Sequence, residues 1–209
     1  MAAAHNSVMH PSDTPPRPSH IFLDMDGVLV DFISAAVRLH GHGHRLAEWP
    51  TGIWEVHSVL GLTPADFWGP IETHGAKFWA ELEPYPWALE LYEQLREIAP
   101  VTIASSPNQD PHCLAGKVQW LQKRFGRRFR DFLIGPPKHL MARPGTVLVD
   151  DSPRMIREFN ATGGRGILFP QPWNDNHPHR QDPLAYVFKQ LERRTGMPAP
   201  SAVEKDAAS

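Results

Sequence analysis

The sequence is poor in cysteine, in long apolar runs and in net charge, and each shortage excludes a class of protein. Cys113 is the only cysteine among 209 residues, so an internal disulfide is excluded, and we expect a reducing, cytoplasmic environment. No apolar run approaches the roughly 18 residues of a membrane-spanning helix, so no membrane partner is expected. The formal net charge of −2 argues against a surface that binds nucleic-acid polymers.

Both ends of the sequence lack the patterning of a folded core. Residues 1–19 are rich in Pro, His and Ser, without the apolar centre of a signal peptide or the composition of an Arg-rich transit peptide. We expect disordered tails at 1–19 and 197–209. His40, His42 and His44 alternate with glycine; a metal-binding tract is one interpretation, and a solvated loop is the preferred one.

Between the tails, short apolar runs alternate with helical patterns. The runs that predict buried strands are Ile21–Asp24, Val101–Ala104, Phe132–Ile134, Val147–Val149 and Ile167–Phe169. The helical patterns cover Phe32–Leu39, Ala88–Ile98, Leu114–Phe125, a segment between Ser152 and Gly163, and Leu184–Leu191. Strands that alternate with helices through short connections predict an α/β, Rossmann-like parallel sheet with helices on both faces.

Acidic residues follow two of the predicted strands. Asp24-Met25-Asp26-Gly27 ends the first, and Asp150-Asp151 directly follows the fourth. The carboxyl ends of parallel strands lie at one edge of a sheet, so these acids are expected to meet. Two carboxylates held ~4 Å apart repel by roughly 4 kcal/mol at an effective dielectric of 20. A divalent cation would remove that repulsion, and oxygen ligands favour Mg²⁺.

Groups suited to binding phosphate follow other predicted strands. Ser105-Ser106-Pro107 comes directly after the second, Lys138 follows the third, and Gly27 allows a sharp turn that brings amides close to an anion. Each segment alone has an ordinary interpretation, as a turn, a loop, a solvated lysine or a helix start. Their occurrence in this order, each at or just beyond a strand end, favours a functional site.

This order of motifs resembles that of the haloacid dehalogenase superfamily of phosphohydrolases. Ile21–Val28 is similar to its first motif, Ser105 and Lys138 occupy the second and third, and Asp150-Asp151 occupies the fourth. Within the superfamily, the sequence is most similar to the 5′(3′)-deoxyribonucleotidases, over roughly residues 20–175. The segments that carry this similarity are Asp24–Phe32, Leu82–Pro86, Ser105–Pro107, Gly116-Lys117 with Trp120-Leu121, and Leu168-Phe169 with Gln171–Asn174. That family usually has Thr-Ser-Pro in the second motif, where this chain has Ser105.

The resemblance implies a Mg²⁺-dependent phosphomonoesterase that acts through an aspartyl-phosphate. Asp24 would be the nucleophile and Asp26 the general acid and base. The resemblance implies Mg²⁺ ligands from Asp24, the Asp26 backbone carbonyl and Asp150, with Asp151 as a ligand or an orienting group. The expected phosphate-binding residues are Ser105, Ser106, Lys138 and Gly27.

The resemblance also implies a small helical cap inserted after the first strand. We predict a core of 20–32 and 84–196 and a cap of 33–83, rich in aromatic residues that could stack a nucleobase. Phe78, Trp79 and Trp54 are the candidates for substrate contact, and the alternative is that they form the core of the cap. The expected partner is a small phosphate ester, most simply a nucleoside monophosphate, and a sugar phosphate is the alternative substrate. A phosphate-binding protein without catalysis is the alternative function. A homodimer is also possible.

Overall fold

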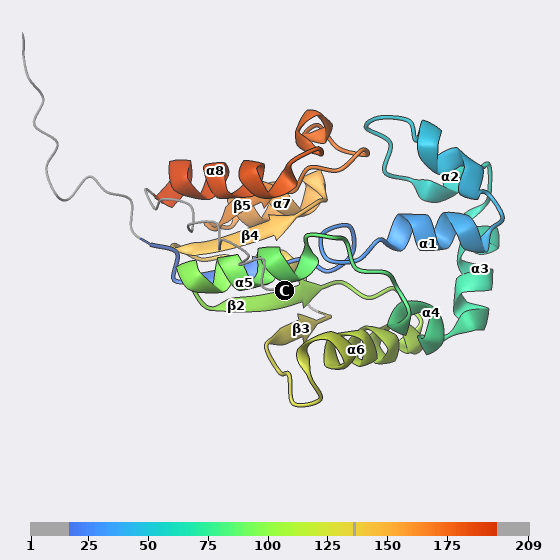
Figure 1. Ribbon diagram of the computed structural model, residues 1–209, viewed down its shortest axis with the longest axis horizontal. Coiled ribbons are helices and arrows are strands. Elements are labelled where there is room, and N and C mark those ends of the chain that lie inside the picture. Colours follow the sequence, from blue (N-terminus) through green and yellow to red (C-terminus); the bar gives the residue numbers. More distant parts are fainter. Residues whose placement is uncertain (1–16, 136, 196–209) are drawn as a thin grey trace, which may run out of the picture.

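Five apolar runs form the strands of one parallel sheet in the computed structural model, which describes residues 17–135 and 137–195 (Figure 1). The strands are β1 (His20–Leu23), β2 (Val101–Ser105), β3 (Phe132–Ile134), β4 (Thr146–Asp150) and β5 (Arg165–Leu168). Their order is β3-β2-β1-β4-β5, and every neighbouring pair is parallel. The predicted α/β fold with a Rossmann-like parallel sheet is therefore confirmed. The strands β2 and β3 lie on one side of β1, and β4 and β5 lie on the other. β1 is therefore the central strand, where the chain order reverses and where such folds bind ligands.

Helices cover both faces of the sheet because side chains alternate along each strand. These helices are α5 (Ala88–Ile98), α6 (Pro111–Phe125), α7 (Pro153–Ala161) and α8 (Pro183–Thr195). Ile21 and Leu23 of β1 pack into the larger hydrophobic cluster with residues of α5, α6 and α8. Phe22, between them, points to the other face and packs with Phe159 of α7. Figure 1 shows α5 and α8 on one side of the sheet and α7 on the other.

The helix boundaries differ from the sequence prediction where a capping residue lies outside the apolar pattern. The helix predicted to begin at Leu114 begins at Pro111, because Asp110 accepts a hydrogen bond from the His112 N–H at 3.0 Å and proline suits the first turn. The last helix continues past Leu191 to Thr195. No helix within the described ranges is long and apolar enough to cross a membrane.

A second group of helices lies beyond the carboxyl ends of the strands (Figure 1). It contains α1 (Phe32–Leu39), a 3-10 helix (Gly43–Glu48), α2 (Val56–Leu60), α3 (Pro64–His74) and α4 (Ala76–Ala80). Two of them have only five residues and α3 contains Pro70, so no helical period extends through this part of the sequence. Their buried side chains belong to the same hydrophobic cluster as those of the sheet, and the limits of the cap at 33–83 stay a prediction.

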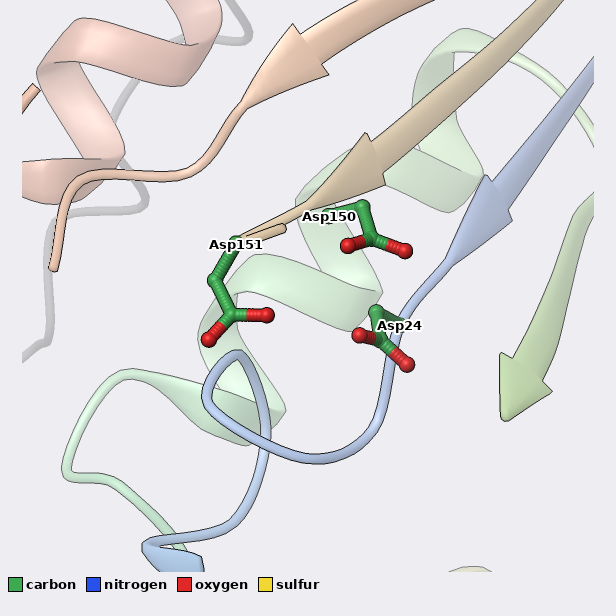
Figure 2. A group of neighbouring side chains, drawn as sticks. All are labelled: Asp24, Asp150 and Asp151. Atoms are coloured by element: carbon green, nitrogen blue, oxygen red, sulfur yellow. The ribbon is translucent and has the colours of Figure 1, made fainter. Parts of the chain in front are cut away.

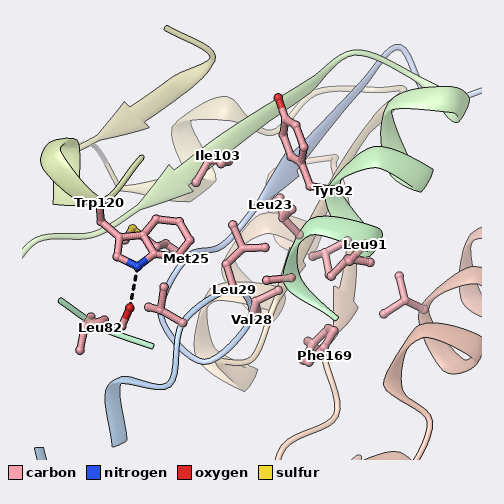
Figure 3. Packing of buried hydrophobic residues seen from close by; sticks show 14 of the residues in the cluster. Leu23, Met25, Val28, Leu29, Leu82, Leu91, Tyr92, Ile103, Trp120 and Phe169 are labelled. Carbon is pink, nitrogen blue, oxygen red and sulfur yellow. Dashed lines mark hydrogen bonds between the residues drawn. The ribbon is translucent and has the colours of Figure 1, made fainter. Parts of the chain in front are cut away.

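Two chain segments connect this helical group to the sheet, and they lie side by side. The Asp31 N–H donates to the Glu83 carbonyl at 2.9 Å, and the Tyr85 N–H donates to the Leu29 carbonyl at 2.9 Å. Trp120 of α6 donates its indole N–H to the Leu82 carbonyl at 2.7 Å, as Figure 3 shows among the surrounding core residues. These bonds hold the connection near the end of β1.

The described residues include only a small part of the predicted tails but the whole histidine-rich segment. The tails at 1–19 and 197–209 fall mostly outside the described residues, although the Ser19 N–H donates to the Gly145 carbonyl at 2.8 Å. His40 pairs with the Phe67 carbonyl at 3.0 Å, and the His42 and His44 rings lie 6.0 Å apart. Within the described residues, none of these histidines belongs to a group of potential metal ligands.

Candidate active site

Three buried acids converge at the carboxyl edge of the sheet. Asp24 directly follows β1, Asp150 is the last residue of β4, and Asp151 comes next; β1 and β4 pair with Leu23 opposite Val149. One carboxylate oxygen from each acid lies within 4.8 Å of the other two. Figure 2 shows the three side chains pointing toward one another. It is the single group of this kind in the described residues, and the strand register produces it.

Lys138 lies between two of these acids. It begins a 3-10 helix, Lys138–Met141, after β3. Its Nζ lies 2.5 Å from Asp24 Oδ1 and 2.6 Å from Asp150 Oδ2, and its side chain is buried. Burial alone would lower the pKa of the Lys138 ammonium, but the carboxylates of Asp150 and Asp24 reverse this and raise it above its ordinary value. Lys138 is therefore held as a cation beside the predicted nucleophile.

A single ammonium does not balance three carboxylates. Burial, and then the charge of Asp150, raises the pKa of Asp24 to about 7. Burial, and then the charge of Asp24, raises the pKa of Asp151 well above its ordinary value. Asp151 Oδ2 accepts the Trp173 indole N–H at 2.8 Å, while its buried Oδ1 has no hydrogen-bond partner within the described chain. The surplus of acids and this unpartnered oxygen fit a hard divalent cation with oxygen ligands.

Gly27 lies against the carboxylate of Asp151, one of the three clustered acids. Its φ is +76°, and a Cβ at this position would lie 2.0 Å from Asp151 Oδ2. Its carbonyl accepts the Gln171 side-chain N–H, and its own N–H donates to the Val30 carbonyl at 2.9 Å. This arrangement does not support the prediction that Gly27 binds phosphate, because the turn uses its N–H. Gly27 instead leaves room for the Asp151 carboxylate.

The two predicted serines meet a lysine that the sequence interpretation did not assign to the site. Ser105 ends β2, and its Oγ accepts a hydrogen bond from Lys117 Nζ at 2.7 Å. The same Nζ donates to the Ser106 carbonyl at 3.1 Å and to Asp26 Oδ2. Lys117 lies on the apolar face of α6, in register with the buried Cys113 and Trp120. A charged residue on a buried helical face was the signal that could have identified it.

A cavity of about 480 Å³ opens beside these residues. Asp26 and Ser106 are among the residues that line it. The aromatic residues that line it are Phe32, Trp54, Phe67, Trp68 and Trp79, and the other lining residues are Ile33, Glu55, Val56, His57, Pro107, Asn108 and Arg154. The cavity therefore joins polar groups at the sheet edge to an aromatic surface.

Two of the three aromatic residues proposed for substrate contact line the cavity, and the third does not. Trp54 is 47 % exposed and lines the cavity, and its ring centre lies 6.3 Å from that of Trp173 in an edge-to-face arrangement. Trp79 lines the cavity although it is almost fully buried. Phe78 does not line it; its ring packs edge-on against Phe32 and Trp79. The prediction for Phe78 is corrected on this point, because neighbouring residues of a short helix point in different directions.

Comparison with known proteins agrees with this geometry. Residues 17–185 match the model of a family described as "5′ nucleotidase, deoxy (Pyrimidine), cytosolic type C protein". The chain belongs to this family. It is therefore a haloacid dehalogenase superfamily hydrolase of phosphate monoesters, similar to 5′-nucleotidases, and the resemblance seen in the sequence motifs is confirmed.

Individual relatives are distant but cover most of the chain. The human cytosolic-type 5′(3′)-deoxyribonucleotidase is 28 % identical over 166 residues, covering 73 % of this chain and 80 % of that protein. The mouse mitochondrial 5′(3′)-deoxyribonucleotidase is 29 % identical over 169 residues, covering 73 % of each chain. A haloacid dehalogenase family hydrolase from Deinococcus radiodurans R1 was solved with bound phosphate and sodium. It is 19 % identical with a TM-score of 0.52, and the match covers 90 % of this chain and 100 % of that chain. The structural likeness supports the fold.

Proposed function

We propose that this hydrolase is a Mg²⁺-dependent phosphatase of nucleoside monophosphates, including deoxynucleotides, that acts through an aspartyl-phosphate. One observation carries the proposal: a single cavity joins Asp26 and Ser106 to an aromatic wall. The polar end suits a phosphate ester and the aromatic wall suits a nucleobase. The names of the two deoxyribonucleotidase relatives support the same substrate class.

The acid cluster would hold the metal. Asp24, Asp150 and Asp151 offer oxygen atoms within 4.8 Å of one another, and the Asp26 backbone carbonyl would complete the protein ligands. A bound Mg²⁺ would polarise a phosphoryl oxygen and offset the negative charge that meets there. Such a cation would favour the ionised carboxylates and so lower the pKa of Asp24 and of Asp151 from the raised levels that burial and mutual repulsion produce.

The protein's own residues would carry out two displacements at phosphorus. Lys138 and the Met25 N–H hold Oδ1 of Asp24, so Oδ2 is free to attack. A bond forms from Oδ2 to phosphorus, the bond from phosphorus to the leaving oxygen breaks, and Asp26 gives that oxygen its proton. Asp26 then takes a proton from water as the water oxygen attacks the aspartyl-phosphate, which releases inorganic phosphate and restores the Asp24 carboxylate.

A substrate panel tests this proposal against its alternatives. Purified protein is assayed for phosphate release from deoxynucleoside, nucleoside and sugar monophosphates, with Mg²⁺ and with EDTA. We expect Mg²⁺-dependent turnover with a higher kcat/KM for the nucleotides. A clear preference for sugar phosphates would assign a different ester, and inactivity on all esters with Mg²⁺ would indicate a phosphate-binding protein without catalysis.

Trp54 provides a prediction on base recognition. Trp54→Ala should raise KM for nucleoside monophosphates by about 5- to 150-fold, because base stacking on an aromatic side chain contributes ~1–3 kcal/mol. The KM for glycerol phosphate, which has no base, should change little. Ile53→Ala is the matched control, since Ile53 is also exposed, at 40 %, but does not line the cavity. Equal KM increases for both esters would assign Trp54 to packing alone.

The acid cluster predicts that Mg²⁺ stabilises the protein. Addition of Mg²⁺ at about 100 times Kd should raise Tm by about 5–10 °C, because the ion binds the folded state. Asp151→Asn should lose most of this shift, since it removes one of the three carboxylates. Asp131→Asn, at an exposed position before β3, should retain it. An unchanged shift in Asp151→Asn would place the ion elsewhere.

The remaining expectations on partners and location belong to the same proposal. A small phosphate ester is the expected partner, without a nucleic-acid polymer or a membrane. A cytoplasmic location stays a prediction; one relative is named cytosolic and another mitochondrial. A homodimer also stays a prediction, which sedimentation of the purified chain can test.

A further inference from the structure

We infer that Lys117 is a positioning residue that holds the proton donor Asp26 and orients the Ser105 hydroxyl. This inference rests on the proposed function, because it assigns a role within the same reaction. Lys117 is fully buried, although lysine is rarely buried without a purpose. Its Nζ donates to three acceptors, namely Asp26 Oδ2, Ser105 Oγ and the Ser106 carbonyl, and an ammonium has three protons to give.

The Asp26 carboxylate depends on Lys117 for its position. Oδ2 accepts the Lys117 Nζ–H, and the buried Oδ1 has no hydrogen-bond partner in the described chain. Within the described residues, no other side chain or amide donates to this carboxylate. Without Lys117, the carboxylate would be free to rotate about its side-chain bonds. A general acid must lie within hydrogen-bond reach of the leaving oxygen, so this rotation would slow proton transfer.

The same ammonium sets the direction of the Ser105 hydroxyl. Ser105 Oγ accepts from Nζ at 2.7 Å and is almost fully buried. A hydroxyl carries one proton and two acceptor positions. Because a lysine can only donate, the Ser105 hydroxyl keeps its own proton for another acceptor, and in the proposed reaction this acceptor would be a phosphate oxygen. Lys117 would thus orient Ser105 as a hydrogen-bond donor to phosphate and hold Asp26 as the general acid for the leaving group.

Lys117 also connects these groups to the aromatic wall of the cavity. Its Nζ lies 5.1 Å from the centre of the Trp79 ring, within the range of a cation–π contact. The preceding residue, Gly116, allows α6 to approach α4 closely: a Cβ there would lie 2.3 Å from the Ala76 carbonyl oxygen and 2.5 Å from the Trp79 Cβ. The wall that would receive the base and the residue that would protonate the leaving group are therefore joined through one side chain.

A purely structural role for Lys117 makes a different prediction. A lysine that only stabilises the fold would, when replaced, reduce turnover of all substrates by a similar factor. A lysine that positions the general acid matters most where the leaving group needs a proton. Nucleosides leave as strongly basic alkoxides unless protonated, whereas p-nitrophenol is acidic enough to leave as an anion.

The experiment compares these two leaving groups in Lys117→Met. We expect kcat to fall by about 100-fold or more for a deoxynucleoside monophosphate, the range that general acid catalysis supplies, and by much less for p-nitrophenyl phosphate. Lys123→Met, at an exposed position of the same helix, should leave both rates unchanged. In the Asp26→Asn background, Lys117→Met should reduce nucleotide turnover far less than it does alone, because the two residues act as one unit.

Each outcome has one interpretation. Equal losses on both esters, or additive losses in the double variant, would overturn the inference. If Lys117→Met does not fold, Lys117→Gln keeps two N–H donors without the charge and provides the same comparison. Failure of both variants to fold would assign Lys117 to stability and overturn the inference as well. Wild-type inactivity on every ester with Mg²⁺ would instead reject the proposed function, so the two failures are distinguishable.

Discussion

Asp24→Asn should abolish turnover of every phosphate ester and leave the fold intact. The variant loses the attacking oxygen, and removal of a nucleophile is expected to lower kcat by at least about 10⁴-fold. The fold should survive because the ionised Asp24 is costly in the folded state without metal: burial and the charge of Asp150 raise its pKa to about 7. A neutral amide removes that repulsion, and Lys138 keeps its contact with Asp150 at 2.6 Å. Phosphate release measures the loss of turnover, and thermal unfolding measures whether the fold is retained.

The matched control for this variant is Asp131→Asn, an equal change of charge at an exposed position. It should keep wild-type kcat and Tm. Near-normal turnover in Asp24→Asn would remove Asp24 from the role of nucleophile. A Tm far below that of the wild type would show that the ion pair with Lys138 outweighs the repulsion among the acids.

Gly27→Ala should lower both stability and turnover strongly. The new Cβ would lie 2.0 Å from Asp151 Oδ2 and 2.6 Å from the carboxyl carbon of Asp151, so the acid cluster or the turn must move. Overpacking of this kind typically costs about 1–3 kcal/mol, and a positive φ adds roughly 1–2 kcal/mol for any residue with a Cβ. Denaturant unfolding, kcat and the Mg²⁺-induced change in Tm together measure the effect.

Gly61→Ala separates the two causes. Gly61 has a nearly equal φ of +71° at the end of α2, but a Cβ there meets no atom within 4 Å. It should lose roughly the cost of a positive φ, about 1–2 kcal/mol, while keeping turnover and the response to Mg²⁺. Equal behaviour of the two alanine variants would show that the Gly27 position serves only the backbone turn.

The sheet and the acid cluster could be predicted because both depend on local patterns. Short apolar runs such as Phe132–Ile134 coincide with strands, and the others differ at their ends by one or two residues. Strand ends differ because hydrogen bonding continues past the apolar run, as at Asp150, which still pairs with Leu168. Once the strands are parallel, residues at their carboxyl ends share one edge. The proximity of Asp24 and Asp150 can therefore be predicted without knowing how the side chains pack.

The cavity wall and Lys117 could not be predicted in the same way. Lys117 meets Asp26 across 91 positions of the sequence, and the contact depends on how α6 packs against α4. Phe32 fits the pattern of a core residue, yet it lines the cavity. Phe78 and Trp79 are neighbours in a five-residue helix, where no period shows which one points inward. The sequence predicts a turn at Gly27, but a glycine that marks a turn does not show which carbonyl accepts its N–H, here that of Val30.

The most direct test of the account is the location of a phosphoryl group during turnover. The protein is mixed with a deoxynucleoside monophosphate and Mg²⁺, quenched in acid within the first turnover, digested and examined by mass spectrometry. The account predicts one phosphoryl group on the peptide that contains Asp24, absent from Asp24→Asn and from samples treated with EDTA. Sustained phosphate release with the phosphoryl group on another residue would contradict it.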